Sequence, residues 1–366
     1  MSTKTYETMS ENKLEIFAKR LKQARIKAKL SMEALCNSMN GLVSKQAISK
    51  YESAKMLPSS TVLISLASSL NVDVDYFFRP FTFEIDDFNM SFRKKADVGS
   101  KETSALKVQI QDDVERYLEI EEILGAKESY LKQIQCNKIE TISDVETYAL
   151  MVRQYWSLGI DGIANVQETL ESHGVKLIYT DAPESFDCVS GIVNGTHSII
   201  VLNSKKTNIE RRRLTSLHEL GHLLLNEKFP TELPQKEKEK LCNAFASEML
   251  LPSEIISCYF RNNSSIAIEE LVSLSEAYGI SIDAIVHKLH SLRIVNDDRY
   301  RSFYIRKSKY ASFKRLVEES RYKECKIDRF KSMVYSALAQ QLISVNKAAS
   351  LLQCSVDHVR KNSNVV

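Results

Sequence analysis

The chain has 366 residues, of which 43% are hydrophobic and 27% are charged. These proportions are typical of globular domains and exclude a disordered or fibrous chain, and the length favours two or three domains over one core. No apolar run approaches the roughly 20 residues that a membrane span needs, and no hydrophobic segment follows Met1. We therefore expect a cytoplasmic protein without membrane contact.

Charge is unevenly distributed along the chain. The whole chain carries a net charge of +3, yet the first 80 residues contain twelve Lys and Arg against seven Asp and Glu. A local basic surplus of this kind is what contacts with phosphate require. The seven cysteines are odd in number and have no CxxC spacing, which favours reduced thiols over disulfides or a cysteine zinc site.

Short helices are predicted over residues 14–80. An amphipathic helix spans Leu14–Ala28, Ser31 is placed to cap a second helix, and a third helix spans Lys45–Glu52. The polar side chains that this third helix and its cap direct outward are those of Ser44, Lys45, Gln46, Ser49 and Lys50. Because Gln suits adenine edges while Lys and Ser suit guanine or phosphate, the third helix is suited to the major groove of DNA. A bundle with a solvated polar face is the alternative.

The order of these segments resembles the Cro/C1-type (XRE) helix-turn-helix family. The resemblance runs from Arg20–Arg25 through Ser31–Leu35 and Ser44–Glu52 to Leu63–Asp73, and it covers about 65 residues. It implies a five-helix bundle that binds double-stranded DNA with its third helix in the major groove. Palindromic operators would favour a homodimer. One departure is the longer connection Met39–Val43 before the third helix.

Two further regions are predicted in the middle of the chain. Residues 81–140 contain a charged run with apolar residues at helical spacing, Val108–Gln135, and are predicted to form a helical linker. Residues 141–297 contain two predicted strands, Val175–Tyr179 and Ser198–Leu202, with turn residues between them and long helices after them.

Residues 298–366 are predicted to form a C-terminal helical domain. Their last stretch, Leu342–Arg360, has a helix-turn-helix pattern of its own, with Ser344 placed as a cap. A dimerisation or substrate-docking bundle is the interpretation that we favour for this stretch. The fold class predicted for the whole chain is predominantly α, in the α+β class, with one small β-sheet.

The most specific motif is His218-Glu219-Leu220-Gly221-His222. On a helix, histidines four residues apart project from one face, so both imidazoles can bind one Zn²⁺ at about 2.0–2.1 Å. Glu219 reaches the same side, where a carboxylate takes a proton from the attacking water and passes it to the leaving amine. The motif therefore predicts a zinc site with an adjacent base.

A chance match is the alternative, because this five-residue pattern arises in roughly one in a hundred chains of this length. The motif would then be two surface histidines beside a solvated Glu. The many flanking leucines argue against this, since they predict a buried helix in which an unpaired charge is costly. Gly221 costs the helix about 1 kcal/mol relative to Ala, but it permits close approach of a strand or a second helix.

A third ligand is expected from the helical segment that ends at Pro252. Glu239 and Asn243 are four residues apart on it, so Glu239 can ligate the metal while Asn243 orients a histidine from the outer shell. Glu237 and Glu248 are rival ligands. From this segment alone, the favoured interpretation of Glu239 is a solvated member of a Lys/Glu run.

Two segments, Thr215–Leu225 and Glu239–Pro252, together resemble the ImmA/IrrE family of metallopeptidases, and the resemblance spans roughly residues 145–295. It implies a zincin-like domain of the gluzincin kind that cleaves a repressor or antitoxin-like DNA-binding protein, in stress responses or mobile elements. The implied zinc ligands are His218, His222 and Glu239, and the implied catalytic base is Glu219. Cys242 stands where the family usually has Ala, which leaves the ligand set intact.

Other interpretations stay open beside an active peptidase. One is a regulator whose metal site is structural or sensory, and another is an interaction protein in which the metal only stabilises the fold. Cys188 is predicted as a buried structural cysteine rather than an inhibitory thiolate. Tyr259 and Tyr278 are both able to donate a hydrogen bond to a tetrahedral oxyanion, and the sequence does not choose between them.

Overall fold

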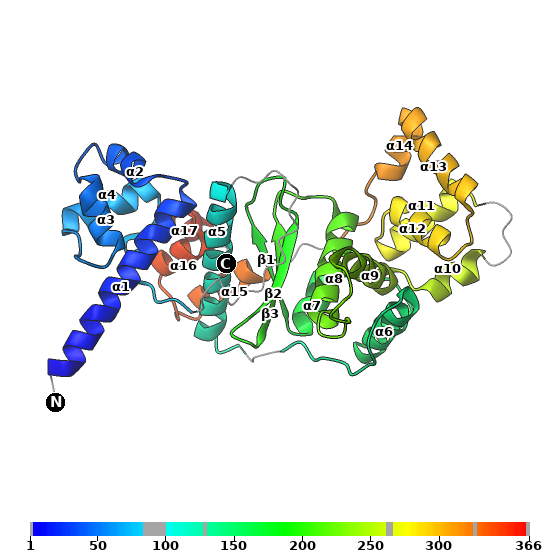
Figure 1. Ribbon diagram of the computed structural model, residues 1–366, viewed down its shortest axis with the longest axis horizontal. Coiled ribbons are helices and arrows are strands. Elements are labelled where there is room, and N and C mark those ends of the chain that lie inside the picture. The colour runs from blue at the N-terminus through cyan, green and yellow to red at the C-terminus, as the bar shows by residue number, and fades with distance from the viewer. Residues whose placement is uncertain (1–2, 83–99, 127–129, 261–265, 325–327, 364–366) are drawn as a thin grey trace. The chain divides into compact units, whose positions relative to one another are not determined.

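The structure is a computed structural model, and it describes residues 3–82, 100–126, 130–260, 266–324 and 328–363. Within these residues the chain forms seventeen α-helices, one 3-10 helix and three strands (Figure 1). The predicted fold class, mainly α with one small sheet, is confirmed. None of the described helices is both long and apolar enough to cross a membrane.

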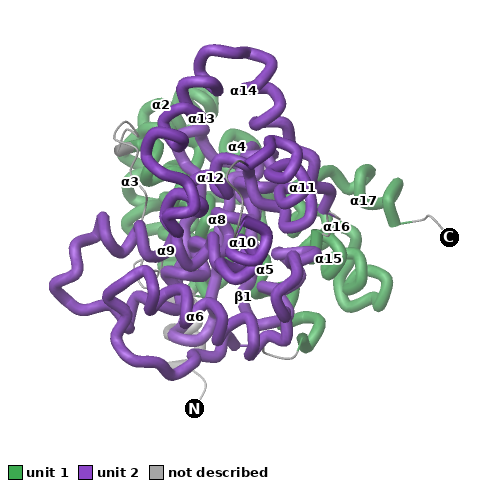
Figure 2. The backbone as a smooth tube through the Cα atoms, turned by 90° about the vertical axis from the view of Figure 1, so that its right-hand side faces the viewer, with its two compact units in different colours: residues 1–88, 94–126, 328–366 green, residues 89–93, 127–327 purple. Residues whose placement is uncertain are grey.

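The chain divides into two compact units (Figure 2). Unit 1 contains residues 1–88, 94–126 and 328–366, and unit 2 contains residues 89–93 and 127–327. Each unit has a hydrophobic core of its own. The last helices of the chain therefore fold with the N-terminal helices, although the whole of unit 2 separates them in sequence.

The N-terminal part of unit 1 is the predicted helix-turn-helix bundle. Its elements are α1 (Thr3–Lys27), α2 (Met32–Ser38), α3 (Lys45–Glu52), α4 (Ser60–Leu70) and the 3-10 helix η1 (Val74–Phe78). The fifth element of the predicted five-helix bundle is thus a short 3-10 helix. The side chains of Phe17, Leu35, Ile48, Leu66 and Phe77 are fully buried between these elements.

The rest of unit 1 is built on a long helix, α5 (Ser100–Ile123). It begins eight residues before the predicted run and ends at Ile123, twelve residues before its predicted end. Most of its side chains from Ala105 to Ile120 are buried, because α1 and α15 pack against it. The C-terminal helices of this unit are α15 (Arg329–Ala339), α16 (Val345–Leu352) and α17 (Val356–Ser363).

Unit 2 contains a three-stranded sheet. Its strands are β1 (Val175–Thr180), β2 (Cys188–Val193) and β3 (His197–Asn203), in the order β1-β3-β2. β3 pairs in parallel with β1 and antiparallel with β2. β1 and β3 are the two predicted strands, whereas β2 was predicted only as a connection with turn residues. Gly191 lies inside β2, where it weakens the strand signal.

Helices of unit 2 pack on one side of this sheet and extend beyond it (Figure 1). α6 (Ile142–Tyr155) and α8 (Ile209–Leu225) both pack against α9 (Gln235–Leu250), and α8 also contacts β2 and β3 (Figure 1). The remaining helices of unit 2 are α7 (Val166–Ser172), α10 (Ser253–Phe260), α11 (Ile268–Tyr278), α12 (Ile282–Ser291), α13 (Asp297–Lys309) and α14 (Ala311–Glu318). The pair α8 and α9 carries the candidate metal ligands.

Candidate metal centre and helix-turn-helix

Helix α8 presents the two motif histidines to the interior of unit 2. Asn208 caps the helix by accepting a hydrogen bond from the backbone amide of Arg211 (2.8 Å). The leucines at 217, 220 and 224 are fully buried and hold α8 against the core. His218 and His222 are also buried, with exposed fractions of 2% and 6%. Their polar rings therefore lie where an unsatisfied nitrogen is costly.

Gly221 allows α9 to approach α8 closely. A Cβ atom at Gly221 would lie 3.3 Å from Cδ1 of Phe245 and 3.4 Å from Cα of Cys242, both on α9. Any larger residue would therefore press against the second helix. The close approach of a second helix that the sequence predicts is confirmed, and it brings Glu239 next to the histidines.

Three side chains from α8 and α9 converge on one point. The Nε2 atoms of His218 and His222 are 3.0 Å apart, and each lies 3.3 Å from one carboxylate oxygen of Glu239. We call this set the triangle. Donor atoms bound to one tetrahedral Zn²⁺ at 2.0–2.1 Å are about 3.3 Å from one another. The separations and the donor types of the triangle therefore fit a zinc ion.

Glu219 lies beside the triangle and is held from the sheet. The Cys188 thiol donates a hydrogen bond to Oε1 of Glu219 (2.8 Å), and the Ser190 hydroxyl donates one to Oε2 (2.6 Å). Cys188 and Ser190 are two residues apart on β2, so their side chains share one face of the strand. Both carboxylate oxygens of Glu219 thus have a donor, which fixes the orientation of this carboxylate.

Glu219 and Glu239 compete for the place of third ligand. The donor atoms of His218, Glu219 and His222 all lie within 4.8 Å of one another, so proximity alone admits Glu219. Glu239 fits the place of the third ligand better, because its two oxygens face the two Nε2 atoms while those of Glu219 accept hydrogen bonds from β2. The Glu219 carboxylate lies beside the triangle and is not one of its three members.

The electrostatic surroundings of His222 favour a positive charge. Burial disfavours the imidazolium, but hydrogen bonds with Cys242 and Glu239 outweigh burial and raise the pKa of His222 to about 10. The Cys242 sulfur lies 3.5 Å from Nδ1 of this ring, and burial raises the pKa of the Cys242 thiol. A metal ion at the triangle would supply this positive charge in place of the proton. Because a metal binds the neutral imidazole, a proton and a metal ion compete for His222.

The rival ligands on α9 have other partners. Glu248 is buried and pairs with Lys288, and it accepts hydrogen bonds from the amide (2.9 Å) and hydroxyl (2.6 Å) of Ser253. Glu237 is half-exposed and lies 3.4 Å from Lys240. The structure thus brings Glu239, and neither of these two glutamates, to the histidines.

The side chain expected to orient a histidine differs from the one found there. Asn243 was predicted for this place, but it is exposed on α9. The atom that contacts Nδ1 of His222 is the sulfur of Cys242, the residue before it. The reason is the packing of α8 on α9, which turns Cys242 toward Gly221 and leaves Asn243 on the solvent side.

Sequence reasoning missed the contacts that Cys188 and Ser190 make with Glu219. The prediction that Cys188 is buried is confirmed, but its thiol also contacts the carboxylate of the motif. Recognition of β2 would have supplied the signal, because residues two apart on a strand face the same way. Of the two tyrosines considered for the oxyanion, Tyr259 is 61% exposed and Tyr278 is 8% exposed.

In unit 1, the predicted DNA-contacting residues gather on one side of α3. Lys45, Gln46, Ser49 and Lys50 are all exposed, while Ile48 on the opposite side is fully buried. The hydroxyl of the preceding Ser44 accepts a hydrogen bond from the amide of Ala47 (3.2 Å) and so caps the helix. The end of α3 is fixed by a bidentate ion pair in which the guanidinium of Arg25 donates to Glu52 at 2.6 and 2.8 Å.

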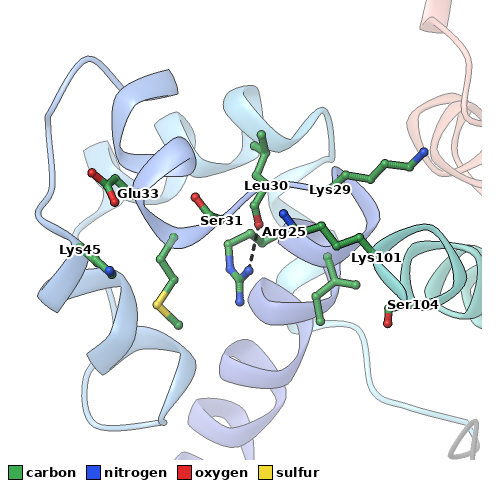
Figure 3. A pocket seen from close by; sticks show the side chains of 10 residues that line it. Arg25, Lys29, Leu30, Ser31, Glu33, Lys45, Lys101 and Ser104 are labelled. Carbon is green, nitrogen blue, oxygen red and sulfur yellow. Dashed lines mark hydrogen bonds between the residues drawn. The ribbon is translucent and has the colours of Figure 1, made fainter. Parts of the chain in front are cut away.

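A hollow of about 490 Å³ lies beside the start of α3 (Figure 3). Its charged lining residues are Arg25, Lys29, Lys45 and Lys101, with Glu33 as the carboxylate. Arg25 is engaged by Glu52 and by the carbonyl of Leu30 (2.9 Å). Lys29 lies 3.8 Å from Glu102, while Lys45 and Lys101 add positive charge to the hollow beside the start of α3.

Two parts of the chain match known domain families. Residues 21–77 match the helix-turn-helix family, and these residues contain α2, α3 and α4. Residues 170–290 match the IrrE N-terminal-like domain, and these contain the sheet, α8 and α9. The predicted fusion of an XRE-type DNA-binding domain with an IrrE-type metallopeptidase domain is therefore confirmed. No curated protein and no solved structure matches the chain.

Proposed function

We propose that this protein is a DNA-binding regulator and a zinc-dependent endopeptidase that cleaves one partner protein, a repressor or antitoxin-like DNA-binding protein. The observation that carries the proposal is the triangle. Its donor atoms are 3.0–3.3 Å apart, and Glu219 lies next to it with both oxygens oriented by β2. A ligand set with a separate, oriented carboxylate is what hydrolysis needs and what a purely structural zinc site does not.

The residues of the site divide the chemistry between them. His218, His222 and Glu239 would hold the zinc, which supplies a Lewis acid and lowers the pKa of a bound water toward ~7. Glu219 accepts the proton of the attacking water at its carboxylate and returns it to the nitrogen of the leaving amine. Cys188 and Ser190 keep the Glu219 carboxylate oriented between these two transfers.

Unit 1 supports the regulatory part of the proposal. The exposed side of α3 carries Lys45, Gln46, Ser49 and Lys50, which suit base edges and phosphates in the major groove. Binding to DNA would locate the peptidase where repressors are bound. A homodimer on a palindromic operator stays a prediction, which sedimentation of the full chain with and without operator DNA would test.

The experiment compares the full chain with Glu219→Gln and His218→Ala. Zinc content is measured by elemental analysis, and each protein is incubated with helix-turn-helix repressors of the same cell, with products identified by mass spectrometry. We expect zinc in the wild type and in Glu219→Gln, little zinc in His218→Ala, and cleavage by the wild type alone.

A matched control is Glu237→Gln, a half-exposed glutamate of α9 outside the triangle, which is expected to keep both zinc and cleavage. Zinc retained with no cleavage of any repressor would favour a regulator whose metal site is structural or sensory. Absence of zinc from every preparation would refute the metal site itself.

A further inference from the structure

The helices α16 and α17 form a helix-turn-helix that lies outside both family matches. The turn has three residues, from Gln353 to Ser355, and Gln353 has the left-handed backbone (φ 50°) that ends a helix sharply. Ser344 caps α16 by accepting a hydrogen bond from the amide of Lys347 (3.2 Å), and Ser355 caps α17 by accepting one from His358 (3.2 Å). A turn of this length between two helices is typical of DNA-binding motifs.

The caps and the buried anchor residue repeat those of α2 and α3, although the connection between α2 and α3 is longer, at six residues. Ser31 and Ser44 cap those helices through backbone amides three residues further on, at 3.0 and 3.2 Å. The fourth residue of the second helix is fully buried in both motifs, as Ile48 in α3 and Val359 in α17. α17 is therefore anchored as α3 is, and equivalent positions of the two helices face solvent.

The exposed side of α17 is polar and basic. Its exposed side chains are Asp357, His358, Arg360, Lys361, Asn362 and Ser363. Arg360 and Lys361 occupy the positions that Ser49 and Lys50 occupy in α3. Arg and Lys bind guanine edges and phosphates, and Asn binds adenine. Residues 328–363 as a whole contain five Lys and Arg against two Asp and Glu, a basic surplus in a short segment.

Two cations of α15 and α16 are paired with carboxylates of α5, whereas those of α17 are not. Lys347 of α16 pairs with Glu119 of α5, and Arg329 of α15 lies 3.8 Å from Glu121. Among the described residues, Arg360 and Lys361 of α17 enter no ion pair, and neither does the exposed Lys331 of α15. The charges of Arg360 and Lys361 are therefore available to a ligand, while those of Lys347 and Arg329 are paired within unit 1.

We propose that α16 and α17 are a second DNA-binding helix-turn-helix, with α17 contacting double-stranded DNA. DNA is favoured over a protein partner because no large apolar side chain is exposed on α17, whereas the centres of protein interfaces are depleted of charged residues and rich in aromatic ones. The proposal rests on neither the peptidase nor α3. It assigns a nucleic-acid ligand to a stretch for which the sequence favoured dimerisation or substrate docking.

The test uses the full chain and a labelled duplex of mixed sequence, with binding followed by fluorescence anisotropy from about 50 to 200 mM salt. The variant is Arg360→Gln with Lys361→Gln. Two lost phosphate contacts reduce the slope of log K against log salt by about two, and we expect binding to be at least about tenfold weaker at the lowest salt. The matched control, Lys132→Gln with Lys138→Gln, removes two exposed charges from unit 2 and is expected to bind as the wild type does.

A second variant, Lys45→Gln with Lys50→Gln, tests α3 in the same assay, so failure of the proposed role of α3 and failure of this inference are distinguishable. Circular dichroism checks that each variant keeps its helices. An unchanged salt slope and affinity in the α17 variant would overturn the inference. Unchanged DNA binding combined with lost self-association in sedimentation would also overturn it and identify α17 as an interface between copies of the chain.

Discussion

Helix α9 carries two glutamates, Glu248 and Glu239, that both face buried, ionisable side chains. They differ in whether protein groups alone neutralise the carboxylate and satisfy its hydrogen bonds. Glu248, near its C-terminal end, is paired with the ammonium of Lys288 and accepts two further hydrogen bonds from Ser253. Glu239, two turns earlier, faces the imidazoles of His218 and His222 and accepts a hydrogen bond from Gln235 (3.1 Å).

The two surroundings distinguish a glutamate that stabilises the fold from a glutamate that is placed to bind a metal ion. The Glu248 pair is already neutral and saturated with donors, so it needs nothing from outside the protein. The triangle combines three acceptors able to bind a cation, and its separations match a tetrahedral ion. Burial alone does not mark a functional site, and the convergence of three side chains of metal-binding types is what distinguishes the triangle from the Glu248 pair.

The largest effect is expected at the structural pair. Glu248→Ala leaves the buried ammonium of Lys288 without its partner, and the free energy of unfolding should fall by about 3–5 kcal/mol. Urea unfolding followed by circular dichroism measures the loss. Removing both charges, as Glu248→Leu with Lys288→Met, should recover most of it. A single variant as stable as the wild type would show that the two clusters do not differ as described.

The triangle should respond in the opposite way. His222→Ala removes one of the three proposed ligands, so zinc affinity should fall by at least about a hundredfold, more than loss of an outer-shell partner costs. The free energy of unfolding measured with a chelator present should change less than in Glu248→Ala. Competition with a chromophoric chelator gives the affinity. Unaltered zinc binding by His222→Ala would place the metal elsewhere.

The contacts from β2 to Glu219 should matter for turnover and not for metal retention. Ser190→Ala removes one of the two donors, and kcat should fall by about tenfold with zinc content unchanged, as for other partners that orient a catalytic group. Ser190→Thr keeps a hydroxyl and should restore part of the rate. Ser198→Ala, at another buried serine of the sheet, is the control and should leave kcat unchanged. Equal losses in Ser190→Ala and Ser198→Ala would point to a general effect on the sheet.

The smallest effect is expected at the contact between α8 and α9. Gly221→Ala gains about 1 kcal/mol of helix propensity but places a methyl group against Phe245 and Cys242. Because crowding costs about 1–3 kcal/mol, the melting temperature should change little while α9 shifts and zinc affinity falls severalfold. Calorimetry gives both quantities. Tighter zinc binding in this variant would show that the close approach does not position Glu239.

Much of the site was predictable because its features are local. The spacing of His218 and His222 follows from helical geometry, and the leucines around them predict a buried helix. Gly221 predicted that a strand or a second helix packs closely against this helix, and α9 does so. The strand β2 was not predicted because Gly191 interrupts its pattern of strand-forming residues. The contacts from β2 that orient Glu219 were therefore not predicted either.

Features that depend on distant partners were not predictable. The polar residues in the middle of α5 suggest an exposed linker, yet they are buried. Glu115 lies 2.8 Å from Arg20, and Asp112 lies 2.5 Å from Arg79 and 2.9 Å from Lys27. Charges buried in this way require partners that are far away in sequence, which no local pattern reveals. The same holds for α15–α17, whose place in unit 1 depends on packing against α5.

The most direct test of the metal site is X-ray absorption at the zinc edge, on the full chain loaded with one equivalent of zinc. We expect about four nitrogen or oxygen ligands at about 2.0–2.1 Å, with the multiple scattering of two imidazoles, and one imidazole fewer in His218→Ala. Sulfur scattering at about 2.3 Å would contradict it, because zinc would then be bound by Cys188 or Cys242 and not by the triangle.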